Sequence, residues 1–279
     1  MIAVIRTVLR SLARTALFAV LVGSVSCMAQ QTDEKNSSQP ANQEGPEANP
    51  GRPTVSTPAT LTPVGYFQFE TGILGAQHYE EFSDRTAINE VIKFTIAKRL
   101  ELLVQSEPAV FSDLGDQHSR DAGGVSLGAQ AVLIPGNERR PTLSVSYFRT
   151  VYDGTAPDLD IGSSRNSAIF LMSTDIRKWH IDTNYIFNQQ IANSVRRAQF
   201  GQTLSVAHPI AGKLQWTGEL WHLTQPFLNG HAAGFLTGPA YSVTPRLVLD
   251  IGFNRGLTST STRWEFFTGF TYLLPKKLW

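Results

Sequence analysis

The chain has 279 residues, of which 42% are hydrophobic, and its formal net charge is +1. This charge is too small to attract a polyanion, so no nucleic-acid partner is predicted. The sequence contains one cysteine, Cys27, and has no zinc-like Cys/His spacing, no phosphate-binding glycine loop and no GxSxG motif. We therefore predict no metal, no cofactor and no catalytic residue.

Residues 1–29 have the layout of a secretory signal peptide. Its basic part holds three arginines: Arg6, Arg10 and Arg14. An apolar run follows at 16–23, too short to cross a bilayer as a helix, and small residues lead to Ala29. The alternatives are a buried N-terminal helix and a lipoprotein signal, in which Cys27 would carry the lipid. In the signal-peptide and lipoprotein interpretations the chain leaves the cytoplasm.

Residues 30–63 are rich in Gln, Asn, Glu, Ser, Thr and Pro and hold almost no apolar side chains. Such a composition buries too little surface to offset the entropy lost on ordering the chain. We predict a disordered periplasmic linker over this range.

Residues 64–279 are predicted to form an all-β domain, because apolar and polar residues alternate in segments of about ten residues. The alternating segments are Phe67–Ile73, Ile88–Ile96, Leu100–Gln105, Gly124–Ile134, Thr142–Thr150, Asn166–Thr174, His180–Phe187, Gln199–Ile210, Gln215–Leu220, Ala232–Val243, Leu247–Asn254 and Arg263–Leu274. These make about twelve strands, an even number, as single-chain bacterial barrels have. Ten or fourteen strands are the alternatives, because 166–174 and 232–243 alternate weakly.

The final segment, 263–274, shows the pattern most clearly. One face carries Trp264, Phe266, Phe270 and Tyr272, while the other mixes a charge, a glycine and a hydroxyl. In a soluble sandwich the aromatic face would point into the core, whereas in an outer-membrane barrel it faces lipid. This strand alone does not distinguish the two.

The connections favour the membrane barrel. Short breaks at 97–98, 175–178, 211–213 and 244–245, with a slightly longer one at 135–141, alternate with mostly longer polar breaks at 75–86, 111–123, 151–165, 189–198 and 256–262. The break at 226–230 is a short exception. Periplasmic turns and extracellular loops alternate in this way in antiparallel transmembrane barrels. A soluble barrel has no reason to sort its loops by length.

Polar and charged residues fall mainly on the face opposite the aromatic residues, where a membrane barrel has its lumen. We predict that a candidate pore is lined by Glu70, Lys93, Glu101, Asp182, Asn184, Glu219, Asp250 and Glu265. The predicted fold is a transmembrane antiparallel β-barrel in the bacterial outer membrane. Within it, Glu70, Asp250 and Glu265 would form an acidic strip or, alternatively, a salt-bridge network with Lys93, Arg99 or Arg246.

Several short motifs resemble the outer-membrane transporter family of the meta-pathway of phenol degradation. The clearest match runs from Gly51-Arg52-Pro53 to Gly65 and into the strand ending at Gly72. Weaker matches lie at 97–102, 123–128 and 244–257, and the sequence departs from the family at Gly123, where an aspartate often follows the glycines. The resemblance implies an outer-membrane channel for small, including aromatic, compounds. It implies no catalytic residues.

The function predicted from these features is passive uptake of small solutes, with outer-membrane lipid as the surroundings. Resemblance to other outer-membrane proteins implies that the barrel-assembly machinery reads the aromatic C-terminal strand. One alternative is a lipase-like enzyme, which needs a serine beside an oriented histidine. His222 and His231 are the only two histidines close together in the sequence, and no serine is near them. Another alternative is a structural or adhesive barrel.

Overall fold

The computed structural model describes residues 45–160 and 163–279, and the predicted signal peptide at 1–29 lies outside this part of the chain. The described residues contain no helix long and apolar enough to cross a membrane. They form strands β1 Phe67–Gln77, β2 Asp84–Ala97, β3 Leu100–Leu114, β4 Gln117–Asp121, β5 Val125–Ile134, β6 Thr142–Tyr152, β7 Ser163–Ile176, β8 Trp179–Ala192, β9 Val195–Ala211, β10 Leu214–Gln225, β11 Gly230–Thr244, β12 Leu247–Gly256 and β13 Trp264–Leu273.

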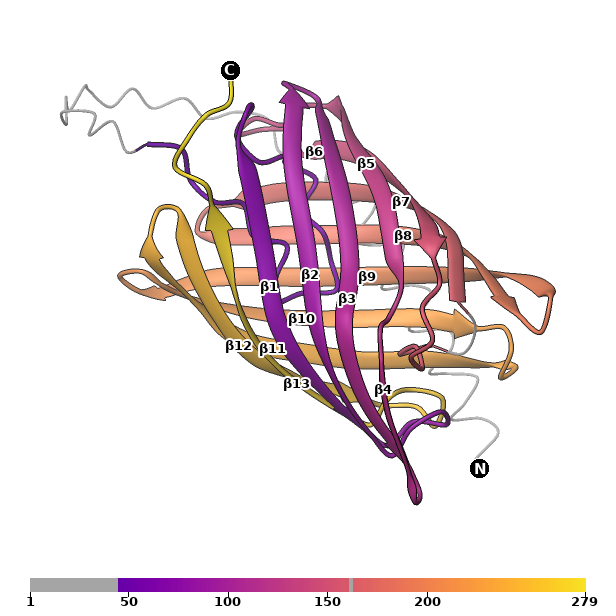
Figure 1. Cartoon of the computed structure of the whole chain (residues 1–279). Coiled ribbons are helices and arrows are strands. Elements are labelled where there is room, and N and C mark those ends of the chain that lie inside the picture. Colours follow the sequence, from indigo (N-terminus) through magenta and orange to yellow (C-terminus); the bar gives the residue numbers. More distant parts are fainter. Residues whose placement is uncertain (1–44, 161–162) are drawn as a thin grey trace, which may run out of the picture. The chain divides into compact units, whose positions relative to one another are not determined.

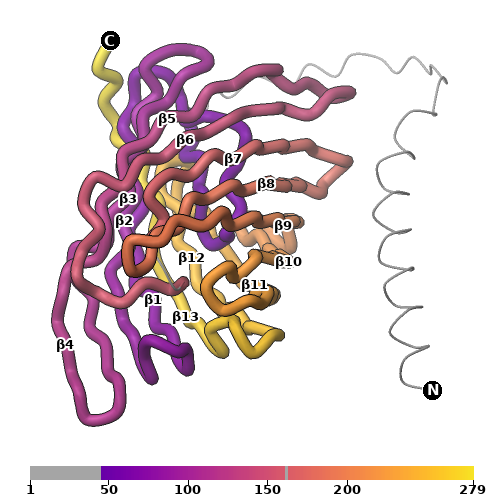
Figure 2. Tube along the Cα trace, turned by 90° about the vertical axis from the view of Figure 1, so that its right-hand side faces the viewer, coloured from indigo at the N-terminus to yellow at the C-terminus, as the bar shows by residue number. Residues whose placement is uncertain are grey.

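The strands form one closed antiparallel barrel (Figure 1). Neighbours in sequence pair in order, β13 pairs with β1, and the pairing of β2 with β3 completes the ring. Strand β4 pairs with the outer part of β3 and adds a hairpin beyond the barrel, which protrudes in Figure 2. The remaining twelve strands make up the wall. The prediction of about twelve strands is therefore confirmed, and the weakly alternating segments became β7 and β11.

The two faces of the wall are the reverse of those in a soluble protein. Large apolar side chains are exposed on the outside, among them Ile73, Phe170, Leu220, Ile251 and Phe266. Polar side chains are buried on the inside; they include Gln68, Glu70, Lys93, Glu101, Gln130, Ser144, Asp182, Asn184, Thr203, Thr217, Glu219 and Asp250. Closing the sheet leaves no unpaired backbone in the apolar band, so this surface suits lipid.

Most short turns lie at one end of the barrel and most longer loops at the other, with the connections 135–141 and 193–194 as exceptions. The turns at 98–99, 177–178, 212–213 and 245–246 lie at the end where β1 starts and β13 ends. The loops at 78–83, 153–160 and 257–263 lie at the other end. We call these ends periplasmic and extracellular, following the short-turn rule of outer-membrane barrels.

Two of the predicted long loops are mostly strand. Strands β8 and β9 continue to a two-residue turn at Asn193-Ser194, and both turn residues have positive φ, as a tight I′ hairpin requires. Strands β3 and β4 likewise extend into the range 111–123. In these outer parts polar residues interrupt the hydrophobic alternation, with Phe111, Leu114 and Val195 as exposed exceptions, while backbone pairing continues.

The segment before β1 enters the barrel. Residues 45–66 precede β1 and run inside the ring of strands, where they appear indigo in Figure 2. The range 45–63 had been predicted to belong to a disordered linker, and that expectation does not hold for this part. The segment has few apolar groups to bury, but its backbone is ordered by hydrogen bonds to side chains of the barrel wall. Residues 30–44 lie outside the described part of the chain.

Candidate functional site

The lumen is crossed by residues 45–62, which we call the belt. Its first fixed point is Gly51, whose backbone N–H donates to both carboxylate oxygens of Glu70, at 3.1 and 3.2 Å. Glu70 also forms an ion pair with Lys93, with 2.5 Å between Nζ and Oε1. Both side chains are almost fully buried, so the pair and the belt amide together compensate the cost of removing the charges from water.

Arg52 forms the second fixed point through Asp250 on β12. The Nε and Nη2 atoms of Arg52 each lie 3.2 Å from an oxygen of Asp250, in the bidentate geometry that suits guanidinium and carboxylate. The guanidinium rests on Gly72 and Gly269, which face each other across β1 and β13. A Cβ at Gly269 would lie 2.8 Å from Nη2 of Arg52, so the glycine pair leaves the room that the side chain needs.

Glu219 on β10 holds the middle of the belt. Its carboxylate accepts hydrogen bonds from the backbone N–H groups of Val55 and Ser56, both at 2.7 Å, and from the Ser56 hydroxyl at 2.5 Å. Ser56 also contacts Thr203 on β9. Because Glu219 is only 3% exposed, these donors replace the water that the charge would otherwise need.

The second half of the belt follows the opposite wall back towards β1. Thr57 exchanges two hydrogen bonds with the amide of Asn184 on β8. Ala59 receives one from Ser144 and donates one to Ser173, on β6 and β7. Thr62 then donates twice to Glu101 on β3. Hydrogen bonds thus join the belt to β1, β2, β3, β5, β6, β7, β8, β9, β10 and β12.

Inward residues of β8 show how the belt divides the lumen. Asp182 lines a periplasmic cavity of about 720 Å³, Asn184 binds the belt, and Ile186 lines a cavity of about 240 Å³ on the other side. Gln190, further along, lines an extracellular cavity of about 410 Å³. Successive inward residues are about 7 Å apart along a strand, so the belt is a thin layer between spaces that open towards opposite ends.

Most of the candidate pore residues are brought together by the belt. Glu70, Glu101, Asn184, Glu219 and Asp250 bind it directly, and each is buried on the inside of the barrel. Lys93 reaches it through Glu70 and through the Asn49 carbonyl. Asp182 instead accepts a hydrogen bond from Ser173 and lies 3.2 Å from Nε2 of His180.

The acidic strip expected from Glu70, Asp250 and Glu265 is only partly assembled. Glu70 and Asp250 bind adjacent belt residues, but each is ion-paired, to Lys93 and Arg52. Glu265 pairs in register with Ala76 and Asn254, four residues beyond Gly269 along β13, which is about 13 Å further towards the extracellular end. Of the expected salt-bridge partners Lys93 participates, whereas Asp250 is paired with Arg52 of the belt rather than with Arg99 or Arg246.

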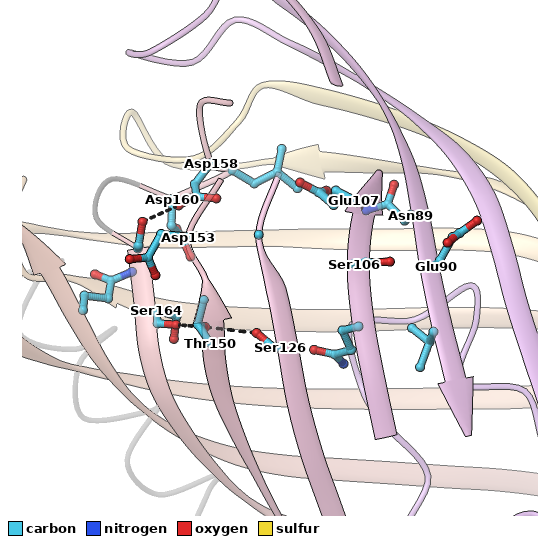
Figure 3. Close-up of a pocket in the computed structure, with 16 residues that line it drawn as sticks. Asn89, Glu90, Ser106, Glu107, Ser126, Thr150, Asp153, Asp158, Asp160 and Ser164 are labelled. Atoms are coloured by element: carbon cyan, nitrogen blue, oxygen red, sulfur yellow. Dashed lines mark hydrogen bonds between the residues drawn. The ribbon is translucent and has the colours of Figure 1, made fainter. Parts of the chain in front are cut away.

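The belt and the extracellular loop residues 153–160 are the parts of the site that sequence reasoning missed. Asp158 and Asp160 of this loop lie at the extracellular cavity together with Asp153 (Figure 3). Burial raises the pKa of Asp158 to about 6 and also raises the pKa of Asp160. One signal did mark the belt: the clearest family-like motif begins at Gly51-Arg52-Pro53, inside the range predicted to be disordered.

The two histidines considered for an enzyme, His222 and His231, contact each other rather than a serine. His222 Nε2 and His231 Nδ1 lie 3.0 Å apart and their rings stack. No serine hydroxyl is hydrogen-bonded to either ring among the residues that the structure describes. The contact between the two rings therefore does not form a serine–histidine pair. Both residues occupy outward positions of β10 and β11, away from the lumen.

No family model and no curated protein sequence matches this chain. Solved structures do. The COG4313 outer membrane channel from Pseudomonas putida F1 aligns with a TM-score of 0.57 at 16% identity, covering 82% of this chain and all of that one. The NanC porin aligns with a TM-score of 0.51 at 10% identity, covering 73% and 100%. At these identities the likeness shows a shared fold, that of barrels of the Gram-negative outer membrane. Membership of the phenol meta-pathway family stays a prediction.

Proposed function

We propose that the protein is a passive outer-membrane channel for small solutes, in which the belt forms the constriction. The observation that carries this proposal is the pair of polar cavities on opposite sides of one thin segment. A barrel that served only as a membrane anchor would have no need of water-accessible space at both ends of its lumen. The fold shared with an outer membrane channel and a porin supports the same conclusion.

Charge in the lumen sets the expected selectivity. Glu101 and Glu219 have no Lys, Arg or His partner among the ion pairs of the described residues, whereas Lys93, Arg52 and His180 each lie beside a carboxylate. An aqueous path past these groups favours cations over anions. Passage of small aromatic or other hydrophobic compounds is the finer part of the proposal, and it rests on the family resemblance of 51–72 alone. The proposal needs no cofactor and no energy coupling.

Planar-bilayer recordings test the channel and its constriction together. We expect small, discrete, cation-preferring conductance steps from the wild-type protein. Arg52→Ala removes the ion pair to Asp250 and leaves that buried carboxylate without its cation, so the belt loses one fixed point and the conductance should rise about twofold or more. Arg139→Ala, at an exposed position in the 135–141 turn, is the matched control and should leave the conductance unchanged.

Bilayers that stay silent with both the wild type and Arg52→Ala would contradict the channel. Steps of equal size in the two proteins would retain the channel but remove the belt as its constriction. Hydrolysis of lipid esters by the same sample would favour the enzyme instead.

A further inference from the structure

The extracellular cavity of about 410 Å³ is rich in acidic groups. Five carboxylates line it, from Glu90, Glu107, Asp153, Asp158 and Asp160, and no Lys or Arg lines it. Figure 3 shows the three aspartates together on one side and Glu107 with Asn89 on the other. Arg85 neutralises Glu107 and Arg165 neutralises Asp153. Glu90, Asp158 and Asp160 remain without a cationic partner in the described part of the chain.

Neutral groups hold two of these unpaired carboxylates in place. The Ser163 hydroxyl donates to Asp158 at 3.1 Å, and the amide of Gln225 donates to Asp160 at 2.5 Å. These bonds orient the carboxylates without cancelling their charge. The cavity therefore keeps a formal charge of about −3 when the three are ionised.

A buried amide facing the cavity gives an independent sign of a ligand. Gln190 is 1% exposed and lines the cavity, and its Oε1 has no hydrogen-bond partner among the described residues. The Oγ of Ser164 and the Oδ1 of Asn89 line the same cavity and are likewise without a partner there. Buried polar atoms are nearly always satisfied. Unpaired carbonyl oxygens beside free carboxylates call for a ligand that brings positive charge and N–H donors.

The spacing of the carboxylates distinguishes a metal ion from an organic cation. No three His, Cys, Asp or Glu side chains within 45–160 and 163–279 converge closely enough to hold a metal ion. The acceptors are instead spread around a space that accommodates several non-hydrogen atoms. A small alkylammonium group can donate up to three hydrogen bonds to such dispersed acceptors.

We propose that this cavity is a binding site for a small organic cation of the primary-amine class, at the extracellular entrance of the lumen. The site deepens the proposed channel function, because a solute bound here would lie at one end of the proposed path. Binding itself does not require that the barrel conducts. Asp158 and Asp160 supply the charge, and Gln190, Ser164 and Asn89 supply the acceptors.

Calorimetry with the purified full-length protein in detergent tests the site with 1,4-diaminobutane as the probe. We expect saturable binding of the diamine, and binding at least tenfold weaker for the uncharged 1,4-butanediol. Asp158→Asn should weaken diamine binding about tenfold, since it removes one charge-assisted contact. Asp116→Asn, an exposed carboxylate at the β3–β4 turn outside the cavity, is the matched control and should bind as the wild type does.

Gln190→Glu distinguishes loss of a contact from a folding defect, because it should strengthen diamine binding whereas Asp158→Asn should weaken it. The substitution is nearly isosteric and adds a negative charge at the unsatisfied oxygen, so diamine binding should become several-fold tighter. Equal affinity for diamine and diol, or unchanged binding in both Asp158→Asn and Gln190→Glu, would overturn the proposal. So would Mg²⁺ binding at the cavity with no diamine binding. Diamine binding by a barrel that is silent in bilayers would support this site and contradict the channel.

Discussion

Neighbouring residues of a wall strand face lipid and lumen in turn, and a substitution at Ile251 tests this assignment. It lies in the middle of β12 and is 59% exposed on the outside, next to Asp250, which is buried on the inside. Ile251→Arg should lower the free energy of unfolding by about 2–4 kcal/mol, because it places a charge near the bilayer midplane. Equilibrium unfolding of the protein in lipid vesicles with urea measures this.

Leu257→Arg is the matched control for that measurement. Leu257 is similarly exposed but lies in the extracellular loop after β12, where a charge costs about 0–1 kcal/mol. Equal destabilisation by the two substitutions would contradict the position of the apolar band.

The inward or outward direction of a side chain could be predicted from sequence, but its partner could not. Alternation with a period of two predicted an inward direction for Glu70, Glu219 and Asp250, since a strand has only two faces, and the three side chains are buried. The partner of Asp250 is Arg52, 198 positions away. Nothing local connects them, because the contact depends on barrel closure and on the path of the belt.

Among the elements, β13 and β4 are predicted to differ sharply in importance. Strand β13 pairs with both β1 and β12, so deleting 264–279 leaves two unpaired edges in lipid. We expect this truncation to abolish insertion, measured as loss of the protease-resistant, heat-modifiable barrel on gels. Replacing 114–117 by Asn-Gly shortens only the β3–β4 hairpin and keeps Asp113, which pairs with β2, so it should leave insertion unchanged. Insertion of the β13 truncation, or failure of the shortened hairpin, would contradict the described pairing.

All twelve wall strands were predictable, while two other features were not. The outer parts of β3, β4, β8 and β9 lack a regular hydrophobic alternation, so a period-two pattern does not reveal them. The belt is ordered without any regular element, through single hydrogen bonds to side chains such as Asn184 and Glu219. Composition indicates whether a segment can order by itself, whereas the belt is ordered by contacts with the barrel wall.

At the scale of the whole molecule, the extracellular entrance should make selectivity depend on pH. The pKa of Asp158 is raised to about 6, chiefly by burial, with Glu107 and Glu81 raising it further and Arg85 and Ser163 opposing them. The carboxyl is therefore ionised at pH 7.5 and protonated at pH 5. Glu81 changes in the same direction, because burial raises its pKa as well. The preference of the channel for cations over anions should therefore decrease when the pH is lowered from 7.5 to 5.

The reversal potential across a bilayer in a KCl gradient measures this preference. We expect it to move towards zero when the extracellular side is acidified to pH 5, and to move less in Asp158→Asn. A potential that is independent of pH, or an unchanged response in the variant, would contradict a role for this carboxyl.

The belt also fixes an order of events in time. It is made before every strand that it touches, yet its partners extend from Thr95 on β2 to Asp250 on β12. These side chains surround one space only after β13 has joined β1. The belt can therefore contact all of these partners together only in the closed barrel, and we expect its ordering to be the last step of maturation. Before this step we expect Glu219 and Asp250 to be in contact with water. The lumen would then be hydrated during assembly and become narrow only after the wall has closed.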